Sequence, residues 1–426
     1  MESIALLFPG QGSQYVGMMK TLYDEFAIVR DTFVEANDIL KFDLRKLCFE
    51  GRIDELTQTQ NVQPALLTAS IAAFRVYMQE VGVTPQYSAG HSLGEYCALT
   101  CSGAIAFSDA LRIVRLRGIY MQESVEKEIG TMIAINGVQK DNVEEVCRII
   151  SNDKNVIAIA CYNSQEQTVI SGTKEAIRLA EEKLSKNGAV FTPLKVCAPF
   201  HSILMQHAAI KLNKELIIYK FNQLKWPVIS NVTGQPYKDE TEIVKNLTNH
   251  VVQPVKWHDS MIFLQKAGVT VTIELGPKEV LKNLIKKNFS NIVALSCNKT
   301  GDLKDIKSTL SLEMKLNVIE NSREVKQQTS RFIDKCLAVV VCTKNYNWNS
   351  EEYYKGVITP YRKIKEMQEY LEIEGKEPSI EQMREVLQLL QSIFLTKKVS
   401  INEQIERFNE IFDDSGVNNL FLQFLK

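Results

Sequence analysis

The sequence AGHSLGEY at positions 89–96 is the feature that most constrains the fold of this chain. Gly90, Ser92 and Gly94 form a G-x-S-x-G pattern, which is typical of a nucleophile elbow. Such a serine lies on a sharp turn between a strand and a helix, and glycines are needed because the turn leaves no room for side chains. Residues 87–89 can end a strand, and 93–104 lack proline and favour a helix. The pattern predicts a serine acyl-enzyme on an α/β scaffold, although an ordinary glycine-rich turn remains an alternative.

A serine nucleophile needs a base, because its hydroxyl is a weak nucleophile at its own pKa. The chain has five histidines, at positions 91, 201, 207, 250 and 258. His201 ends the apolar stretch KVCAPFH, and this position favours it as the base. His91 adjoins the serine and is expected to be structural, whereas His250 and His258 lie in a polar stretch and are expected to be solvated. The residues alone favour His201 and leave the others open.

Several separated motifs occur in one order through about the first 290 residues. They are LLFPGQGSQYVGM at 6–18, QPALLTAS at 63–70, AGHSLGEY at 89–96, LRGIYMQ at 116–122, APFHS at 198–202, SNVTG at 230–234, QPVKW at 253–257 and ELGP at 274–277. In this respect the chain resembles the malonyl-CoA:acyl carrier protein transacylases, the acyltransferases of fatty acid and polyketide synthesis. With its helical extension it resembles a free-standing, trans-acting member.

The resemblance implies that Ser92 is the nucleophile and His201 the general base. The family uses a dyad, in which a backbone carbonyl near His250 orients the histidine, so that no buried carboxylate is required. Glu95 is accordingly expected to face solvent or to cap its helix. Gln11 and the backbone N–H of Leu93 would stabilise the oxyanion.

Substrate contacts are also implied by the resemblance. Arg117 would bind the free carboxylate of a malonyl group, since a guanidinium can pair with a carboxylate through two hydrogen bonds. Without the family, Arg117 would be interpreted as part of a solvated helix face. Phe200, Gln63 and Asn163 would complete the substrate site, with Phe200 either selecting malonyl over bulkier groups or simply packing in the core. Cys161 departs from the family pattern, because many relatives have asparagine there.

Composition narrows the functional classes. The chain has 426 residues, 45% hydrophobic and 24% charged, with a formal net charge of -1, so neither nucleic acid nor a membrane surface is an expected partner. Nine cysteines without a C-x-x-C pair predict reduced thiols in a cytoplasmic protein. No residue spacing indicates a metal site. We expect no bound cofactor, with coenzyme A and phosphopantetheine entering only as parts of substrates.

Short β-type runs alternate with helical stretches such as 63–79, which predicts an α/β fold with a mostly parallel sheet. The large α/β-hydrolase-like subdomain is expected to comprise 1–126 and 198–298. Residues 127–197 predict a small ferredoxin-like subdomain with strands in 130–138, 155–163, 167–172 and 189–196 and helices at 142–151 and 174–187. The active site is then expected in the cleft between the two subdomains.

Residues 299–330 are expected to form a helix and linker, and 331–426 a mainly helical extension. Capping boxes at Ser379 and Ser400 predict two amphipathic helices, and 361–371 predicts another. The apolar positions expected to be buried are Met383, Val386, Leu387, Leu390, Ile393, Phe394, Ile401, Ile405, Phe408, Ile411 and Phe412. The aromatics of NYNW at 345–348 could form a docking surface, but we expect them to pack on neighbouring helices.

Together these features predict malonyl transfer from malonyl-CoA to an acyl carrier protein through a Ser92 acyl-enzyme, serving a polyketide synthase that the extension could contact. An acyl hydrolase of the same fold is the main alternative, and Arg117 favours transfer over it. A non-catalytic scaffold is disfavoured by the intact Gln11, Ser92, Arg117 and His201. A generic carboxylesterase would leave the other ordered motifs unexplained.

Overall fold

The computed structural model describes residues 3–124, 130–194, 196, 198–310, 332–376 and 378–415. The chain divides into two compact units, 1–310 and 311–426, each with its own buried core. Of the helix and linker predicted at 299–330, the structure has a helix at Gly301–Thr309, and positions 311–330 lie outside the described residues. No described helix is both long and apolar enough to cross a membrane.

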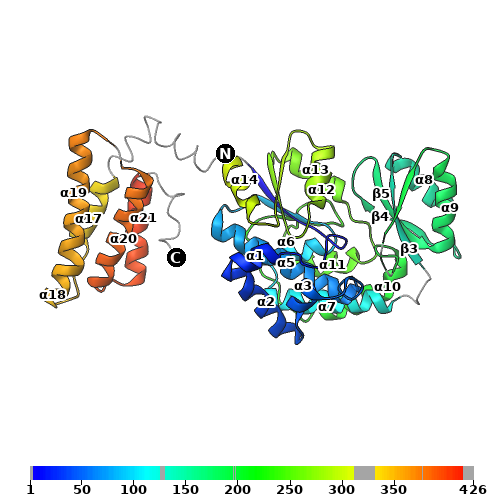
Figure 1. Cartoon of the computed structure of the whole chain (residues 1–426), viewed down its shortest axis with the longest axis horizontal. Helices are drawn as coiled ribbons and strands as arrows, with labels where there is room; N and C mark the ends of the chain where they lie inside the picture. Colours follow the sequence, from blue (N-terminus) through cyan, green and yellow to red (C-terminus); the bar gives the residue numbers. More distant parts are fainter. Residues whose placement is uncertain are drawn as a thin grey trace. The chain divides into compact units, whose positions relative to one another are not determined.

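The first unit is built around a parallel five-stranded sheet (Figure 1). Its strand order is β7 (Val228–Ile229), β2 (Tyr87–Gly90), β1 (Ile4–Phe8), β8 (Val271–Leu275) and β9 (Val293–Cys297). β1 and β8 are buried along their whole length, as expected for parallel strands covered on both faces. In the register of β1 and β2, Phe8 lies opposite Gly90. This pairing sets the loop after β1 beside the G-x-S-x-G turn at the carboxyl edge of the sheet.

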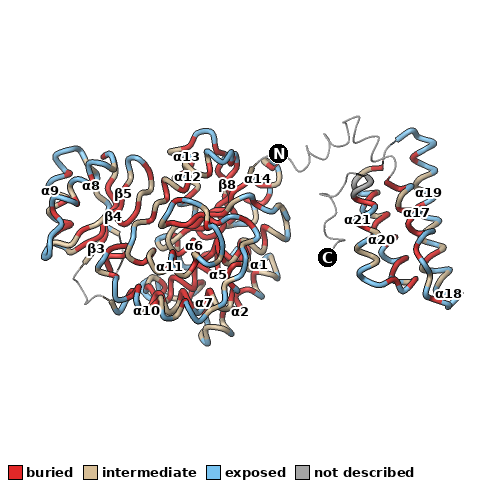
Figure 2. The backbone as a smooth tube through the Cα atoms, turned by 180° about the vertical axis from the view of Figure 1, so that it is seen from behind, coloured by how far each residue is buried: buried red, intermediate tan, exposed pale blue. Residues whose placement is uncertain are grey.

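Helices surround this sheet, and α6 (Leu93–Cys101) packs directly on β1 and β2. The α5 helix (Thr59–Glu80) confirms the helix predicted at 63–79, and it is buried along most of its length (Figure 2). Short 3-10 turns η1 (Ile203–Met205) and η2 (Glu240–Glu242) precede α10 (Gln206–Leu216) and α11 (Ile243–His250). The helices are α1 (Lys20–Glu25), α2 (Ala27–Leu40), α3 (Leu44–Glu50), α4 (Ile53–Leu56), α5 (Thr59–Glu80), α6 (Leu93–Cys101), α7 (Phe107–Glu123), α10 (Gln206–Leu216), α11 (Ile243–His250), α12 (Trp257–Lys266), α13 (Val280–Asn288) and α14 (Gly301–Thr309).

The small subdomain has the predicted ferredoxin-like pattern. An antiparallel sheet has the order β4 (Ile157–Tyr162), β5 (Gln167–Thr173), β3 (Gly130–Asn136) and β6 (Val190–Pro193). The helices α8 (Lys140–Ile150) and α9 (Lys174–Ser185) share one apolar core with the sheet. The predicted elements here are confirmed to within a few residues. The chain returns from β6 to the large subdomain just before His201.

The second unit is helical. It comprises α17 (Phe332–Cys342), α18 (Ser350–Tyr353), the π-helical turn η3 (Tyr354–Ile358), α19 (Thr359–Glu374), α20 (Ile380–Thr396) and α21 (Ile401–Ser415). The capping box at Ser379 is present with both reciprocal hydrogen bonds. The predicted apolar face of α20 is fully buried, as are Phe408, Ile411 and Phe412 of α21. Two positions predicted to be buried are not: Ile401 is 73% exposed at the start of its helix, and Ile405 is only partly buried.

The aromatics of the 345–348 segment do not pack as predicted. Trp348 is 89% exposed and Tyr346 47% exposed. The cause is the buried Asn347 between them, whose Nδ2 donates to the backbone oxygen of Thr396 and to Glu352. With the Asn347 side chain turned inward, the neighbouring aromatic rings are left on the surface.

Candidate active site

The G-x-S-x-G segment forms a sharp strand-turn-helix. Ser92 joins β2 to α6 with φ of 50° and ψ of -105°, a conformation that is strained for a residue with a side chain. A Cβ on Gly90 would lie 1.9 Å from backbone atoms of Gly94, and a Cβ on Gly94 would lie 2.0 Å from the Phe8 oxygen. Only glycine fits at either position, so the close packing that the motif predicts is present here.

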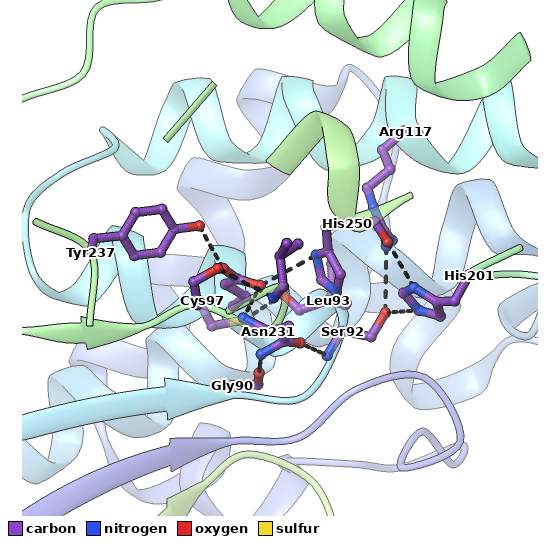
Figure 3. Close-up of polar contacts among 12 residues, drawn as sticks. Gly90, Ser92, Leu93, Cys97, Arg117, His201, Asn231, Tyr237 and His250 are labelled. Atoms are coloured by element: carbon purple, nitrogen blue, oxygen red, sulfur yellow. Dashed lines mark hydrogen bonds and ion pairs between the residues drawn. The ribbon is translucent and has the colours of Figure 1, made fainter. Parts of the chain in front are cut away.

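Ser92 and His201 are brought together from positions 109 residues apart (Figure 3). Ser92 Oγ lies 2.9 Å from His201 Nε2, and His201 Nδ1 lies 2.8 Å from the backbone oxygen of His250. Because a carbonyl oxygen can only accept, Nδ1 carries the proton and Nε2 is free to accept one from the Ser92 hydroxyl. His201 also has a positive φ of 58°, so both residues of this pair have strained backbones.

The environment keeps His201 neutral. Burial lowers its pKa to about 3, and the positive charge of Arg117 acts in the same direction. An uncharged imidazole is the form that can take up a proton at neutral pH.

Arg117 projects from α7 toward the same serine and is only 2% exposed. Its Nη2 lies 3.4 Å from Ser92 Oγ, and its Nη1 donates to Gln63 Oε1 at 2.8 Å. Both partners are uncharged, and Nε has no hydrogen-bond partner among the described residues. Burial lowers the pKa of this guanidinium. A buried cation whose side-chain hydrogen bonds go to neutral groups, beside a nucleophile, is suited to binding an anion.

Of the two polar residues predicted to contact the substrate, Asn163 lines the cavity and Gln63 does not. Gln63 is buried behind Arg117 and is not among the cavity-lining residues, so it holds the guanidinium and does not face the predicted substrate space. Asn163 does line the cavity, where its Oδ1 lies 2.9 Å from His91 Nε2 and its Nδ2 donates to Gln167.

A cavity of about 590 Å³ lies between the two subdomains of the first unit. On the large-subdomain side it is lined by Gln11, Ser92, Leu93, Arg117, Phe200 and His201. Gly10 lets the Gln11 loop approach the elbow, because a Cβ there would lie 2.4 Å from the His91 oxygen. The opposite wall is mostly apolar and includes Met132, Ala134, Cys161, Val169, Leu194 and Val196. Cys161 therefore contributes an apolar surface, since burial raises the pKa of its thiol to about 12.

Two expectations about polar residues are wrong. Glu95 neither faces solvent nor caps its helix; its exposed fraction is 0%, because α6 is buried on all sides. His250 and His258 are also buried, at 0% and 6% exposure, since the helices that carry them pack into the large subdomain.

Asn231 was missed as a site residue. It lies in the SNVTG motif that the sequence singled out, but nothing local marks its role. Its Oδ1 accepts from the backbone N of Ser92 at 2.8 Å, and its Nδ2 donates to the Gly90 oxygen at 2.7 Å. Among the described residues no group of three or more histidine, cysteine or acidic side chains is arranged to hold a metal.

The fold and this site are those of an acyltransferase, and comparison with known proteins agrees. Residues 5–330 match the family model "Acyl transferase domain". A malonyl CoA-acyl carrier protein transacylase of Bacillus subtilis is 39% identical over 405 residues, covering 95% of this chain and 99% of the relative. The enzyme of that name from Escherichia coli K12 is 40% identical over 300 residues, covering 70% of this chain and 97% of the relative.

Solved structures are similar as well. The malonyl CoA-acyl carrier protein transacylase of Coxiella burnetii has a TM-score of 0.71 at 38% identity, covering 73% of this chain and 98% of that one. A malonyl-transacylase solved with the holo acyl carrier protein of a type II polyketide synthase has a TM-score of 0.70 at 37% identity, covering 72% and 99%. The chain thus belongs to the malonyl-CoA:acyl carrier protein transacylase family.

Proposed function

We propose that this acyltransferase moves the malonyl group from malonyl-CoA to the phosphopantetheine thiol of an acyl carrier protein through a covalent Ser92 intermediate. One observation carries the proposal: the buried Arg117 guanidinium lies 3.4 Å from the Oγ atom that is in hydrogen-bond contact with His201. This juxtaposition supports a nucleophile that reacts with acyl groups bearing a second, negatively charged end.

In the first half-reaction, Ser92 Oγ attacks the thioester carbonyl while His201 Nε2 takes its proton. The resulting oxyanion is stabilised by Gln11 and the backbone N–H of Leu93, both of which line the cavity. The C–S bond then breaks, and the thiolate of coenzyme A leaves with the proton from His201. The carbonyl oxygen of His250 stabilises the transient imidazolium through Nδ1–H.

In the second half-reaction, the phosphopantetheine thiol enters the same cavity and gives its proton to His201. The sulfur attacks the malonyl ester, and Ser92 regains its proton when the ester bond breaks. These steps balance without a metal or a bound redox cofactor, so we propose none. Malonyl-CoA and the carrier protein bind in turn, which predicts ping-pong kinetics.

The test is intact-protein mass spectrometry after mixing with malonyl-CoA, acetyl-CoA or methylmalonyl-CoA, followed by a phosphopantetheinylated carrier protein. A malonyl adduct on Ser92 that moves to the carrier is the expected result. An adduct lost to water equally fast with or without carrier would replace the proposal by an acyl hydrolase. No adduct with any acyl-CoA would indicate a non-catalytic scaffold.

We further propose that the enzyme serves a polyketide synthase in trans and that its second unit docks there. The transacylase solved with a type II polyketide carrier protein supports the pathway, and the exposed Trp348 and Tyr346 support the docking surface. The expected result is that Trp348→Ser weakens binding to the cognate synthase, whereas Ile373→Ser does not; Ile373 is the matched control because it is 84% exposed on α19. Equal binding by both variants would refute the docking role.

A cytoplasmic location is proposed as well, because the eight cysteines of the described residues are free thiols.

A further inference from the structure

Three residues after the nucleophile, α6 carries a buried carboxylate, Glu95, that the acyl-transfer steps do not use. Glu95 contacts two hydrogen-bond donors of the 231–237 segment and the ring of His250. Tyr237 donates its hydroxyl to Oε1, the backbone N of Asn231 donates to Oε2 at 3.2 Å, and His250 Nδ1 lies 3.3 Å from Oε2. The Glu95 side chain is completely shielded from solvent. Its carboxylate therefore joins the segment of Asn231 to that of His250.

Asn231 connects this carboxylate to the nucleophile. Its side-chain amide bonds the backbone that leads into the elbow: Oδ1 accepts from the nitrogen of Ser92, and Nδ2 donates to the oxygen of Gly90 (Figure 3). These two contacts fix the peptide groups on either side of His91, directly before the strained Ser92. A shift of Asn231 would therefore move Ser92 Oγ.

His250 connects the same carboxylate to the base. Its backbone oxygen accepts the hydrogen bond from His201 Nδ1 at 2.8 Å, and its ring lies 5.0 Å from the His201 ring at an interplanar angle of 32°. Neither nitrogen of the buried His250 ring has a hydrogen-bond partner among the described residues, and its Nδ1 lies 3.3 Å from Glu95 Oε2. A shift of His250 would rotate or displace the His201 imidazole.

We propose that Glu95 is a positioning residue. Through Asn231 it holds the backbone that carries the nucleophile Ser92, and through His250 it holds the base His201. It thereby keeps Ser92 Oγ and His201 Nε2 at the distance that acyl transfer needs. This inference rests on the proposed function. Glu95 touches neither Ser92 Oγ nor the His201 ring in any described contact, so it acts through its neighbours. Burying a carboxylate is costly, and a well-packed apolar side chain at such a position often gives equal or greater stability. A positional role accounts for the carboxylate better than stability does.

The test uses full-length enzyme and the rate of Ser92 malonylation, followed by rapid quench and intact mass. Glu95→Leu removes both acceptor oxygens at similar volume and is expected to lower the acylation kcat about 100-fold, as for a displacement of about 1 Å. The KM for malonyl-CoA is expected to change less than about 3-fold, because Glu95 does not line the cavity. Glu95→Gln keeps one acceptor oxygen for Asn231 and is expected to recover most of the rate.

Asp302→Leu is the matched control, because Asp302 is a buried carboxylate that accepts from two backbone nitrogens away from the site. It is expected to lose stability without losing the acylation rate of the folded fraction. Should Glu95→Leu not fold, Asn231→Ala tests the next step of this connection, because it removes the side-chain amide that contacts Ser92 and Gly90, and it is expected to show the same loss in kcat.

The proposal is overturned if folded Glu95→Leu acylates at the wild-type rate, if Glu95→Gln is as slow as Glu95→Leu, or if Asn231→Ala leaves kcat unchanged. Failure of the proposed function is a separate result, because the wild-type enzyme itself would then form no malonyl adduct.

Discussion

Replacing Arg117 by alanine should lower kcat/KM for malonyl-CoA much more than kcat/KM for acetyl-CoA. The guanidinium is 2% exposed and held by Gln63, so it is fixed in place before a substrate arrives. Its distance of 3.4 Å from Ser92 Oγ puts it within reach of a carboxylate on an acyl group bound to that oxygen. The acetyl group has no carboxylate and cannot use this contact.

The magnitude follows from the environment of the pair. Truncating one partner of a buried, hydrogen-bonded charge pair costs about 2 to 5 kcal/mol. At about 1.4 kcal/mol per tenfold change, this predicts a 30-fold to several thousand-fold loss in kcat/KM for malonyl-CoA. The loss for acetyl-CoA should stay within about threefold. Arg117→Lys should lie between wild type and Arg117→Ala, since an ammonium cannot form the two-pronged pair.

The assay compares kcat/KM for malonyl-CoA and acetyl-CoA in the same preparation, so that a reduced folded fraction cancels from the ratio. Arg112→Ala is the control, because Arg112 lies on the same helix with its side chain 51% exposed and paired to Asp109. The ratio should be unchanged in that variant. Equal losses for both substrates in Arg117→Ala would refute a carboxylate-binding role.

Three further outcomes are expected. Burial lowers the pKa of His201 to about 3 but raises the pKa of Glu95 to about 7, so the pH–rate profile is measured on Glu95→Gln, in which Glu95 no longer titrates. In that variant kcat/KM for malonyl-CoA should show no acidic limb near pH 6.5, and a limb there would contradict the buried base. Phe200→Ser should raise the methylmalonyl-to-malonyl ratio of kcat/KM by widening the cavity, and an unchanged ratio would assign Phe200 to packing alone. Lys397→Met should lower the free energy of unfolding of the helical unit by about 1–3 kcal/mol, measured in urea, because the buried Nζ donates to the backbone oxygens of Val340 and Thr343. The control Lys398→Met should have little effect.

The sequence predicted those parts of the molecule that depend on neighbouring residues. The elbow follows from the two glycines around Ser92, since a side chain on Gly90 would conflict with the backbone of Gly94 within the same five residues. The capping box at Ser379 and the apolar face of α20 follow in the same way from local spacing. The small subdomain was predictable because its strands and helices alternate regularly along the chain.

The supporting contacts of the site could not be predicted in this way. Asn231 meets Ser92 across 139 residues, and Gln63 meets Arg117 across 54, so neither pair leaves a local pattern. Glu95 was misplaced because a lone carboxylate is rarely buried unless it has partners, and its partners come from distant segments. Trp348 was misplaced for the opposite reason: the polar Asn347 occupies the interior that the aromatic ring was expected to fill.

The two strained residues of the site depend on one short region of the chain. The nitrogen of Ser92 is held by Asn231, which lies just after β7, and Nδ1 of His201 is held by the oxygen of His250, which ends α11. Positive φ values at both residues store conformational energy that these hydrogen bonds must offset. Residues 228–250 therefore act as the common frame for nucleophile and base, even though they contribute no reacting side chain. It follows that changes in this frame should appear first in kcat, since substrate contacts come from other parts of the cavity wall.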